Sequence, residues 1–417
     1  MSRRHEPAQA TAAPAESLVD TVFEAEIGKV AHGGHCVARH DGQVVFVRHT
    51  LPGERVRVRV TRGRVGDRFL LGDAVEVIEA SPHRRPPPCP FSGPGRCGGC
   101  DWQHADLGYQ RELKAAVVNE QLHRLAGLDL DVAVEPVPGD ADGLRWRTRV
   151  EFAVDAAGRA GLRRHHSHDV IQVDDCLIAT ERVAGSGVLE RPWPKADAVD
   201  VVDAPDEPRA LMIPVHDGRA SARDIVQRVD TGDWSGEFHL SARGFWQVHP
   251  GAAATFVAAV LEQLAPRAGE RALDLYAGVG LFARALADAV GPDGAVLAVE
   301  ADARAVRDAT RNLADRPQVE VRRGKVDRAL RPLLRQDISA DLVVLDPPRT
   351  GAGRSVIRDI AALRPRAVAY VACDPAALAR DLAYAKQAGF AVRSVRAFDA
   401  FPMTHHVECI AILEPTA

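Results

Sequence analysis

Residues 271–282 read RALDLYAGVGLF, and this stretch decides the fold of the C-terminal part of the chain. An apolar strand that carries Asp274 runs into a glycine turn at Gly278 and Gly280, and helical spacing follows from Phe282. From about Gly251 onward, apolar strands alternate with helical segments in the same way, which is typical of a doubly wound parallel sheet. The sequence therefore predicts an α/β fold with a Rossmann-like C-terminal sheet.

The glycine turn also indicates the kind of cofactor. The next apolar strand, residues 295–299, ends in Glu300, at about the 20-residue spacing from which a carboxylate binds ribose hydroxyls. The third glycine of the dinucleotide fingerprint is missing, so a cofactor with a ribose but no pyrophosphate fits better than NAD. S-adenosyl-L-methionine is the commonest such cofactor, and we expect Gly278, Gly280 and Glu300 to bind it.

Two later strands end at residues whose side chains can take part in catalysis. Strand 341–345 ends at Asp346, and strand 367–372 ends at Cys373. In open α/β sheets the carboxyl ends of the strands form the ligand-binding edge. Glu408 begins the last apolar strand and is expected to share that edge. A thiolate that adds to a pyrimidine ring and a carboxylate that removes a ring proton would together allow methylation of a uracil carbon.

The N-terminal part has a different pattern. Between about Val19 and Ala80, short alternating strands are separated by glycine turns, which predicts a small closed β-barrel. The period of two in strand 55–60 places alternate arginines on one face, and further arginines follow. This face is either a solvated strand surface or a phosphate-contacting surface. Its arginines are Arg55, Arg57, Arg59, Arg62, Arg64 and Arg68.

A cysteine segment follows the barrel. Cys89, Cys97 and Cys100 lie among glycines and prolines, and Cys176 is distant in sequence. Four thiolates can close an iron–sulfur or a zinc site, and three close cysteines with one remote cysteine favour a cluster over zinc. Two further cysteines, Cys36 and Cys409, have no such context and are expected to be structural. We interpret His165, His166 and His168 as part of a polar loop rather than as metal ligands.

Composition excludes some classes of protein. The 417 residues carry a formal net charge of −4, which argues against bulk affinity for nucleic acid but not against local basic patches. No apolar run approaches the roughly 20 residues that cross a bilayer. The Ala- and Pro-rich opening, residues 1–15, lacks the apolar core of a signal peptide. We expect a cytoplasmic monomer without a membrane segment.

Three motifs together resemble those of the RNA uracil-C5 methyltransferases, which make 5-methyluridine in tRNA and ribosomal RNA. The motifs are Asp346 to Gly351 (DPPRTG), Tyr370 to Cys373, and Phe401 to Glu408 (FPMTHHVE). The resemblance covers nearly the whole chain. It implies a TRAM-type RNA-binding barrel, a class I methyltransferase sheet and [4Fe–4S] ligation by Cys89, Cys97, Cys100 and Cys176.

The resemblance also assigns roles to single residues. Cys373 is similar to the family nucleophile and Glu408 to the base that takes the C5 proton. Cofactor contacts are implied for Gln247, Tyr276, Glu300 and Asp346. The RNA partner is expected to contact the barrel and the central domain. The chain departs from the family pattern at His249, Leu281, Ala372 and Asp374.

These expectations divide the chain into four segments: a disordered tail (1–18), the barrel (19–81), a central α+β domain with the cysteine cluster (82–250) and the methyltransferase domain (251–417). Three alternative functions remain open. One is a methyltransferase acting on another base, the second is a non-catalytic RNA-binding protein that retains the fold, and the third is an iron–sulfur redox enzyme.

Overall fold

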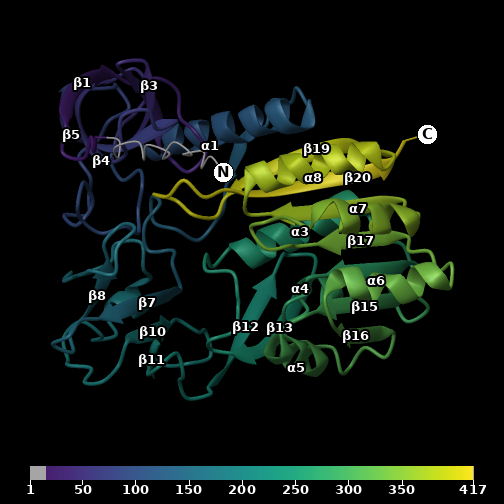
Figure 1. Ribbon diagram of the computed structural model, residues 1–417. Coiled ribbons are helices and arrows are strands. Elements are labelled where there is room, and N and C mark those ends of the chain that lie inside the picture. The colour runs from purple at the N-terminus through teal and green to yellow at the C-terminus, as the bar shows by residue number, and fades with distance from the viewer. Residues whose placement is uncertain (1–15, 417) are drawn as a thin grey trace, which may run out of the picture. The chain divides into compact units, whose positions relative to one another are not determined.

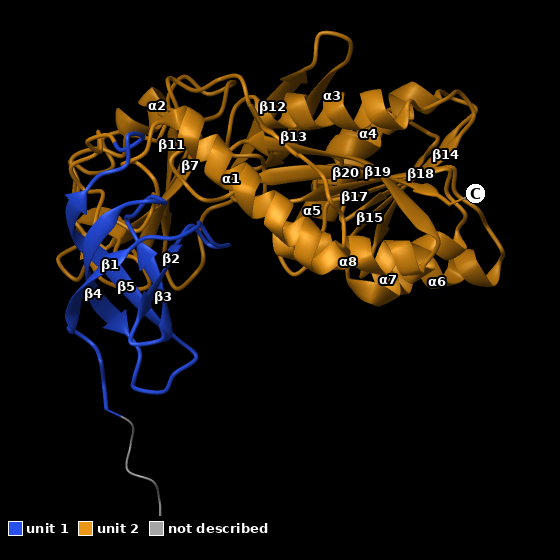
Figure 2. Cartoon of the chain, turned by 90° about the horizontal axis from the view of Figure 1, so that it is seen from above, with its two compact units in different colours: residues 1–84 blue, residues 85–417 orange. Residues whose placement is uncertain are grey.

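The computed structural model describes residues 16–416, and the chain divides into two compact units, residues 1–84 and 85–417 (Figure 2). Most of the expected tail lies outside the described residues. Backbone hydrogen bonds to the first unit begin at Glu16, whose carbonyl accepts from Val65 N at 3.0 Å, and continue with Leu18 N to Gly63 O at 3.1 Å. The barrel unit therefore includes residues that we had assigned to the tail.

The first unit contains the expected β-barrel. Its five strands pair in the order β1-β4-β5-β3-β2. They are β1 (Val22–Glu26), β2 (Cys36–His40), β3 (Gln43–Arg48), β4 (Arg55–Arg62) and β5 (Phe69–Glu79). Beyond β1, Gly28 N donates to Val37 O at 2.8 Å and Val37 N donates to Lys29 O at 3.0 Å. These two bonds join the chain after β1 to β2 and close the barrel.

A buried carboxylate fixes the end of this unit. Glu54 is 1% exposed, and its side chain accepts hydrogen bonds from Leu51 N, Ser81 N and the Arg84 guanidinium. A buried charge is stable only when it is paired and hydrogen-bonded, so Ser81 to Arg84 must stay with the barrel. The barrel accordingly ends at Arg84 rather than at the expected residue 81.

An eight-stranded sheet organises the second unit (Figure 1), with strand order β16-β15-β14-β17-β18-β20-β19-β6. The strands from β14 to β18 are parallel to their neighbours, and β20 is antiparallel to both β18 and β19. The strands are β6 (Val134–Pro136), β14 (Arg271–Leu275), β15 (Ala295–Glu300), β16 (Val319–Arg323), β17 (Leu342–Leu345), β18 (Ala367–Ala372), β19 (Phe390–Asp399) and β20 (Glu408–Pro415).

Helices cover both faces of this sheet, as expected for a doubly wound fold (Figure 1). Alternate strand residues enter two separate cores. Ala272, for example, packs with α3 and α4, whereas Leu273 packs with α6, α7, α8 and α1. The helices are α1 (Leu107–Gln121), α3 (Ala252–Leu264), α4 (Leu281–Val290), α5 (Ala303–Asn312), α6 (Val326–Arg335), α7 (Gly353–Ala362) and α8 (Pro375–Gln387). A π-helical turn, Leu122–Ala126, follows α1.

The remaining elements form a second sheet and a hairpin. The sheet order is β11-β10-β7-β8-β9, and β12 pairs with β13. These elements are β7 (Arg149–Val154), β8 (Ala160–Arg163), β9 (Val170–Ile171), α2 (Glu181–Ala184), β10 (Ala198–Val202), β11 (Leu211–Val215), β12 (Asp224–Asp230) and β13 (Ser235–Ser241).

The expected boundary between residues 250 and 251 does not separate two units. Strand β6 lies in the expected central domain but pairs in parallel with β19 at the edge of the C-terminal sheet. Val118 and Leu122, in and after α1, pack into the same core as α8. Residues from Arg85 onward therefore share cores and form one unit. Within residues 16–416, no helix combines the length and apolar character needed to traverse a lipid bilayer.

Asp381 in α8 holds the turn that follows the DPPR motif. Its side chain is fully buried, and one carboxylate oxygen accepts from Ala352 N at 2.7 Å, Gly353 N at 3.0 Å and the Tyr370 hydroxyl at 2.7 Å. Ala352 and Gly353 are part-buried and the Tyr370 hydroxyl is buried, so removing this acceptor would leave a buried hydroxyl without it, which costs more than the bond itself contributes.

We predict that Asp381→Ala lowers the free energy of unfolding of the second unit by about 3 kcal/mol, because it removes the acceptor of three hydrogen bonds. All five tryptophans lie beyond residue 84, so tryptophan fluorescence measured during urea denaturation reports on the unfolding of this unit. The control is Glu262→Ala, which removes a carboxylate that is 73% exposed and pairs with Arg396. This substitution should change the free energy of unfolding by less than about 0.5 kcal/mol. Equal effects of the two substitutions would contradict this role of Asp381.

Candidate active site

The pairing of β18 with β20 brings Cys373 and Glu408 together. Ala372 is opposite Cys409, the last pair of this antiparallel ladder, and continuing the register by one residue would bring Cys373, which follows β18, opposite Glu408. Residues directly opposite in an antiparallel pair have Cβ atoms about 4.5–5.5 Å apart and point to the same face. Asp346 follows β17, the neighbour of β18 on the other side. The three residues therefore lie at one edge of the sheet.

This edge forms the wall of a cavity of about 1180 Å³ in the second unit. The sheet-edge residues that line it are Tyr276, Gly278, Glu300, Asp346, Cys373 and Glu408, and Gln247 lines it from the loop after β13. The cavity is large enough for a cofactor together with a nucleotide. Glu408 is only 3% exposed and is placed at the buried end of the site.

The Glu300 carboxylate is held at the end of β15 by backbone donors. One of its oxygens accepts from Gly278 N at 2.9 Å, and the other accepts from Ala301 N at 2.6 Å and Asp302 N at 2.7 Å. These bonds fix the carboxylate between the glycine turn and the cavity. Tyr276 has a φ of +64°, which is strained for a residue with a side chain and is found mostly at functional sites.

Gly280 and Gly278 differ in their position relative to the cavity. Gly278 lines the cavity, but Gly280 is the N-cap of α4 with a φ of +91°, and a Cβ there would stand 3.0 Å from Leu313 Cδ1. The left-handed backbone and the close approach of Leu313 both require glycine. Gly280 thus shapes the turn from behind and is not among the residues that line the cavity.

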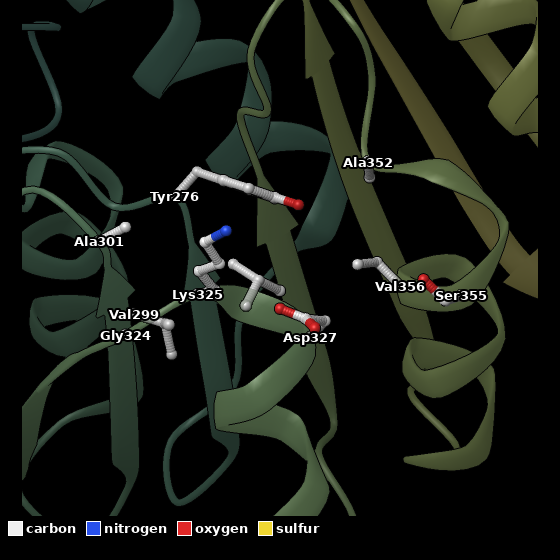
Figure 3. Close-up of a pocket in the computed structure, with 10 residues that line it drawn as sticks. Tyr276, Val299, Ala301, Gly324, Lys325, Asp327, Ala352, Ser355 and Val356 are labelled. Atoms are coloured by element: carbon white, nitrogen blue, oxygen red, sulfur yellow. The ribbon is translucent and has the colours of Figure 1, made fainter.

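A smaller cavity of about 300 Å³ adjoins the first (Figure 3). Tyr276 and Ala301 line both, so the two are neighbours. Val299 and Val356 give the smaller cavity apolar walls, and Lys325 and Asp327 add polar groups to it (Figure 3). Apolar walls with a few polar groups suit a flat heteroaromatic ring that is joined to a ribose.

Buried acids lie at this edge of the sheet, and burial makes each of them harder to ionise. Burial raises the pKa of both Asp346 and Asp274 to about 7, and burial together with Asp346 raises the pKa of Glu408 well above its usual value. The pKa of Cys373 is raised to about 11 by burial and then by Glu408 and Asp346, and Arg349 lowers it. At neutral pH the thiol is therefore protonated in the protein alone. A cation placed among these groups would lower all four pKa values.

The four candidate cysteine ligands lie around one small cavity of about 80 Å³, which Cys89, Cys97, Cys100 and Cys176 all line. Each thiol has a hydrogen-bond donor: Phe91 and Ser92 N–H for Cys89, Gly99 N for Cys97, the Gln103 side chain for Cys100, and Ala179 N–H for Cys176. However, no group of three or more His, Cys, Asp or Glu side chains in residues 16–416 is arranged to hold a metal ion. The expected ligands are gathered, but no preformed ion site is present among them.

Several residues of the main cavity were missed by the sequence analysis. His165, which we assigned to a polar loop, lines the cavity, and a Cβ on Gly98 would stand 2.6 Å from its Cα. His406 also lines it, and burial lowers its pKa to about 3, so it is neutral there. His406 stands in the quoted motif Phe401 to Glu408 but was given no role there, and no local pattern marked His165. Others in this group are Asp101, Trp146, Arg147, Phe245, Thr404 and His405.

Comparisons with known proteins agree with this architecture. The model of the TRAM domain matches residues 16–75, and the model of the tRNA (uracil-5-)-methyltransferase family matches residues 225–416. An uncharacterized RNA methyltransferase of Streptomyces coelicolor is 51% identical, over 96% of this chain and 94% of its own. One of Bifidobacterium longum is 38% identical, over 94% and 97%.

Among solved structures, the Pyrococcus abyssi tRNA (uracil-54, C5)-methyltransferase in complex with S-adenosyl-L-homocysteine shares the fold. Its TM-score is 0.67 at 20% sequence identity, over 94% of this chain and 99% of that one. Fold and site thus define a class I methyltransferase with an N-terminal TRAM domain, as the sequence predicted. The chain belongs to the family of RNA methyltransferases that carries the tRNA (uracil-5-)-methyltransferase module.

We predict that alkylation of Cys373 by iodoacetamide accelerates up to about pH 11 instead of levelling off near the usual thiol pKa of 9.0. Glu408→Gln removes a negative neighbour, so alkylation at pH 9 should become faster, whereas Arg349→Ala should make it slower. Peptide mass spectrometry of the cofactor-free protein measures both rates. A plateau near pH 9, or slower alkylation of Glu408→Gln, would contradict the proposed electrostatics.

Proposed function

We propose that this enzyme transfers a methyl group from S-adenosyl-L-methionine to C5 of a uridine in ribosomal RNA or tRNA. The observation that carries the proposal is that Cys373 and Glu408, each next to the last ladder pair of β18 and β20, line the same cavity. A nucleophilic thiol and a carboxyl base directly opposite each other can act on adjacent ring carbons. Membership of the uracil-5 family supports the same reaction.

The cofactor is proposed to lie along the sheet edge. Glu300 would hold the ribose hydroxyls, and the smaller cavity between Val299 and Val326 would take the adenine. Gly278 and Gln247 would contact the methionine end in the main cavity. S-adenosyl-L-methionine supplies the methyl group on a positively charged sulfur. Beside that positive charge the cavity-lining acids Asp346 and Glu408, whose pKa values burial raises, would ionise more readily.

In the proposed mechanism, the Cys373 thiolate adds to C6 of a uracil that has been flipped into the cavity. The added electron density makes C5 nucleophilic, and C5 takes the methyl group. Glu408 then removes the C5 proton, the C5–C6 double bond re-forms and the bond from C6 to Cys373 breaks. Because the cationic cofactor lowers the pKa of Cys373, thiolate formation is favoured only when the methyl donor is in place.

The barrel is proposed to bind RNA through only part of its arginine strand. Arg55 pairs with Glu79 and Glu24, and Arg57 pairs with Glu76 and Glu24, so neither stands unopposed on the surface. Of the two alternatives for this face, these ion pairs favour a solvated strand surface at Arg55 and Arg57. In residues 16–416, Arg59, Arg62 and Arg68 make no ion pair. Phe69 beside them is 48% exposed and could stack on an unpaired base.

We further propose that Cys89, Cys97, Cys100 and Cys176 bind a [4Fe–4S] cluster rather than zinc. Their common cavity and the donors to each sulfur support ligation by thiolates. A cluster of four irons is larger than a single ion, so its thiolates stand farther apart. When bound, the cluster would cross-link the segment 89–100 to Cys176.

The central prediction is that the purified protein, given methyl-labelled S-adenosyl-L-methionine and unmodified RNA, produces labelled 5-methyluridine. Cys373→Ala should abolish the product, because addition to C6 is lost. Nucleoside mass spectrometry of ribosomal RNA and of tRNA measures the product and identifies the substrate. A different labelled nucleoside would indicate another target base. RNA binding without any methylation would indicate a non-catalytic role.

For the barrel, we predict that Arg59→Gln and Arg62→Gln each lower the slope of log affinity against log salt by about 1, as expected for the loss of one phosphate contact. Arg57→Gln is the matched control, since its charge is already paired, and it should leave the slope unchanged. Filter binding of a ribosomal RNA fragment over a salt series measures the slopes. An equal loss for all three variants would contradict this assignment.

For the cysteines, we predict that protein purified without oxygen contains iron and acid-labile sulfide in a ratio near one. Cys97→Ser should lose both, whereas Cys36→Ser lies in the barrel and should lose neither. Metal and sulfide analysis of the two variants measures this. Stoichiometric zinc without sulfide would overturn the cluster in favour of a zinc site.

A further inference from the structure

The loop that precedes the proposed base is held by the cysteine segment. We call residues 400–407, between β19 and β20, the base loop, and residues 89–104 the cysteine segment. Met403 O accepts backbone N–H groups from Asp101 at 2.9 Å and Trp102 at 3.0 Å. Met403 N donates to the buried Gln110 side chain at 2.8 Å. The backbone of the base loop is therefore bound at its centre to elements about 300 residues earlier.

Met403 is also strained. Its φ is +66°, and it is only 6% exposed. A buried residue with a long side chain stays in the left-handed region only when its surroundings hold it there. The hydrogen bonds to Asp101, Trp102 and Gln110 supply that constraint. Without them, we expect the base loop to relax to a different path.

Asp101 makes a second contact with the base loop. Its Oδ2 accepts from His405 N at 3.1 Å and contacts His405 Nδ1 at 2.6 Å. His405 precedes Glu408 by three residues. The Asp101 side chain is 14% exposed, so the pair is largely shielded from water. Asp101 thus fixes both the backbone and the ring of His405, three residues before β20 begins.

On its other side, Asp101 is joined to the candidate cluster ligands. It follows Cys100 directly. Gln103 binds two of the cysteines, because its Nε2 donates to Cys100 Sγ at 3.2 Å and its Oε1 accepts from Cys89 N at 3.1 Å. A continuous set of contacts therefore runs from the cysteines through Asp101 and Met403 to the loop before Glu408.

We propose that Asp101 is a positioning residue that holds Glu408 ready to remove the C5 proton, so that the cysteine segment acts on the last chemical step and not only on RNA binding. This inference rests on the proposed function. In that reaction the bond from Cys373 to C6 forms and C5 takes the methyl group before the proton leaves. If Glu408 is displaced, the electron pair of the C5–H bond cannot re-form the double bond. The methylated RNA then stays attached to Cys373.

The test compares Asp101→Ala with Asp101→Asn, which keeps an oxygen acceptor for His405, and with Asp106→Ala. Asp106 belongs to the same region and caps α1, where its Oδ1 accepts from Tyr109 N at 2.8 Å. We expect Asp101→Ala to lower kcat by up to about 100-fold, as a misplaced catalytic group does. Its KM for RNA and its Kd for S-adenosyl-L-homocysteine should stay within about twofold of wild type.

The decisive readout is the fraction of enzyme attached to RNA after denaturation. Asp101→Ala should accumulate a methylated adduct at Cys373, as Glu408→Gln does, whereas Asp101→Asn and Asp106→Ala should resemble wild type. A raised KM with unchanged kcat, or a slow Asp101→Ala enzyme without any adduct, would overturn the inference.

Hydrogen exchange of the free protein separates this inference from the reaction. Amides of residues 400–408 should exchange faster in Asp101→Ala than in Asp106→Ala, whether or not the substrate RNA has been found. Unchanged exchange in both variants would overturn the positioning role. Wild-type protein that makes no 5-methyluridine would instead count against the proposed function alone.

Discussion

The antiparallel pairing of β20 with β18 is the constraint on which the site depends. The ladder that ends at Ala372 and Cys409 sets Cys373 opposite Glu408. A register slip of one residue would turn the glutamate to the other face of the sheet, away from the thiol. The register is fixed by burial, because β18 and the greater part of β20 are buried on both faces between two helical layers. The hydrophobic core thus determines how close Cys373, the proposed nucleophile, lies to Glu408, the proposed base.

Electrostatics adds a second level to this arrangement. The sheet edge gathers acids whose burial raises their pKa values, and the same charges keep the Cys373 thiol protonated. A positively charged ligand in this site would lower these pKa values. Backbone strain is found in the same region, at Tyr276 beside the cofactor turn and at Met403 in the base loop. Both residues are held by neighbouring structure, which is how proteins maintain strained positions at functional sites.

Sequence alone predicted the elements that follow local rules. Period-two strands and the glycine turn gave the sheet and barrel, and the ends of strands placed Asp346 and Cys373 at one edge. Contacts between residues far apart in the sequence could not be predicted from local patterns. The ion pairs of Arg55 and Arg57 depend on Glu24, Glu76 and Glu79 of neighbouring strands, whose register the sequence does not give. Likewise, His165 and Asp101 reach the cavity only through tertiary packing. The expected boundary at residue 250 failed because β6 joins a sheet formed by much later strands.

The most direct test of the account is the intact mass of Glu408→Gln after incubation with unmodified RNA and S-adenosyl-L-methionine. The account predicts a covalent complex whose mass is the sum of protein, RNA fragment and one methyl group. Digestion should map the attachment to Cys373. Release of 5-methyluridine by this variant at the wild-type rate, or attachment at another cysteine, would show that the register of β18 and β20 does not pair the nucleophile with its base.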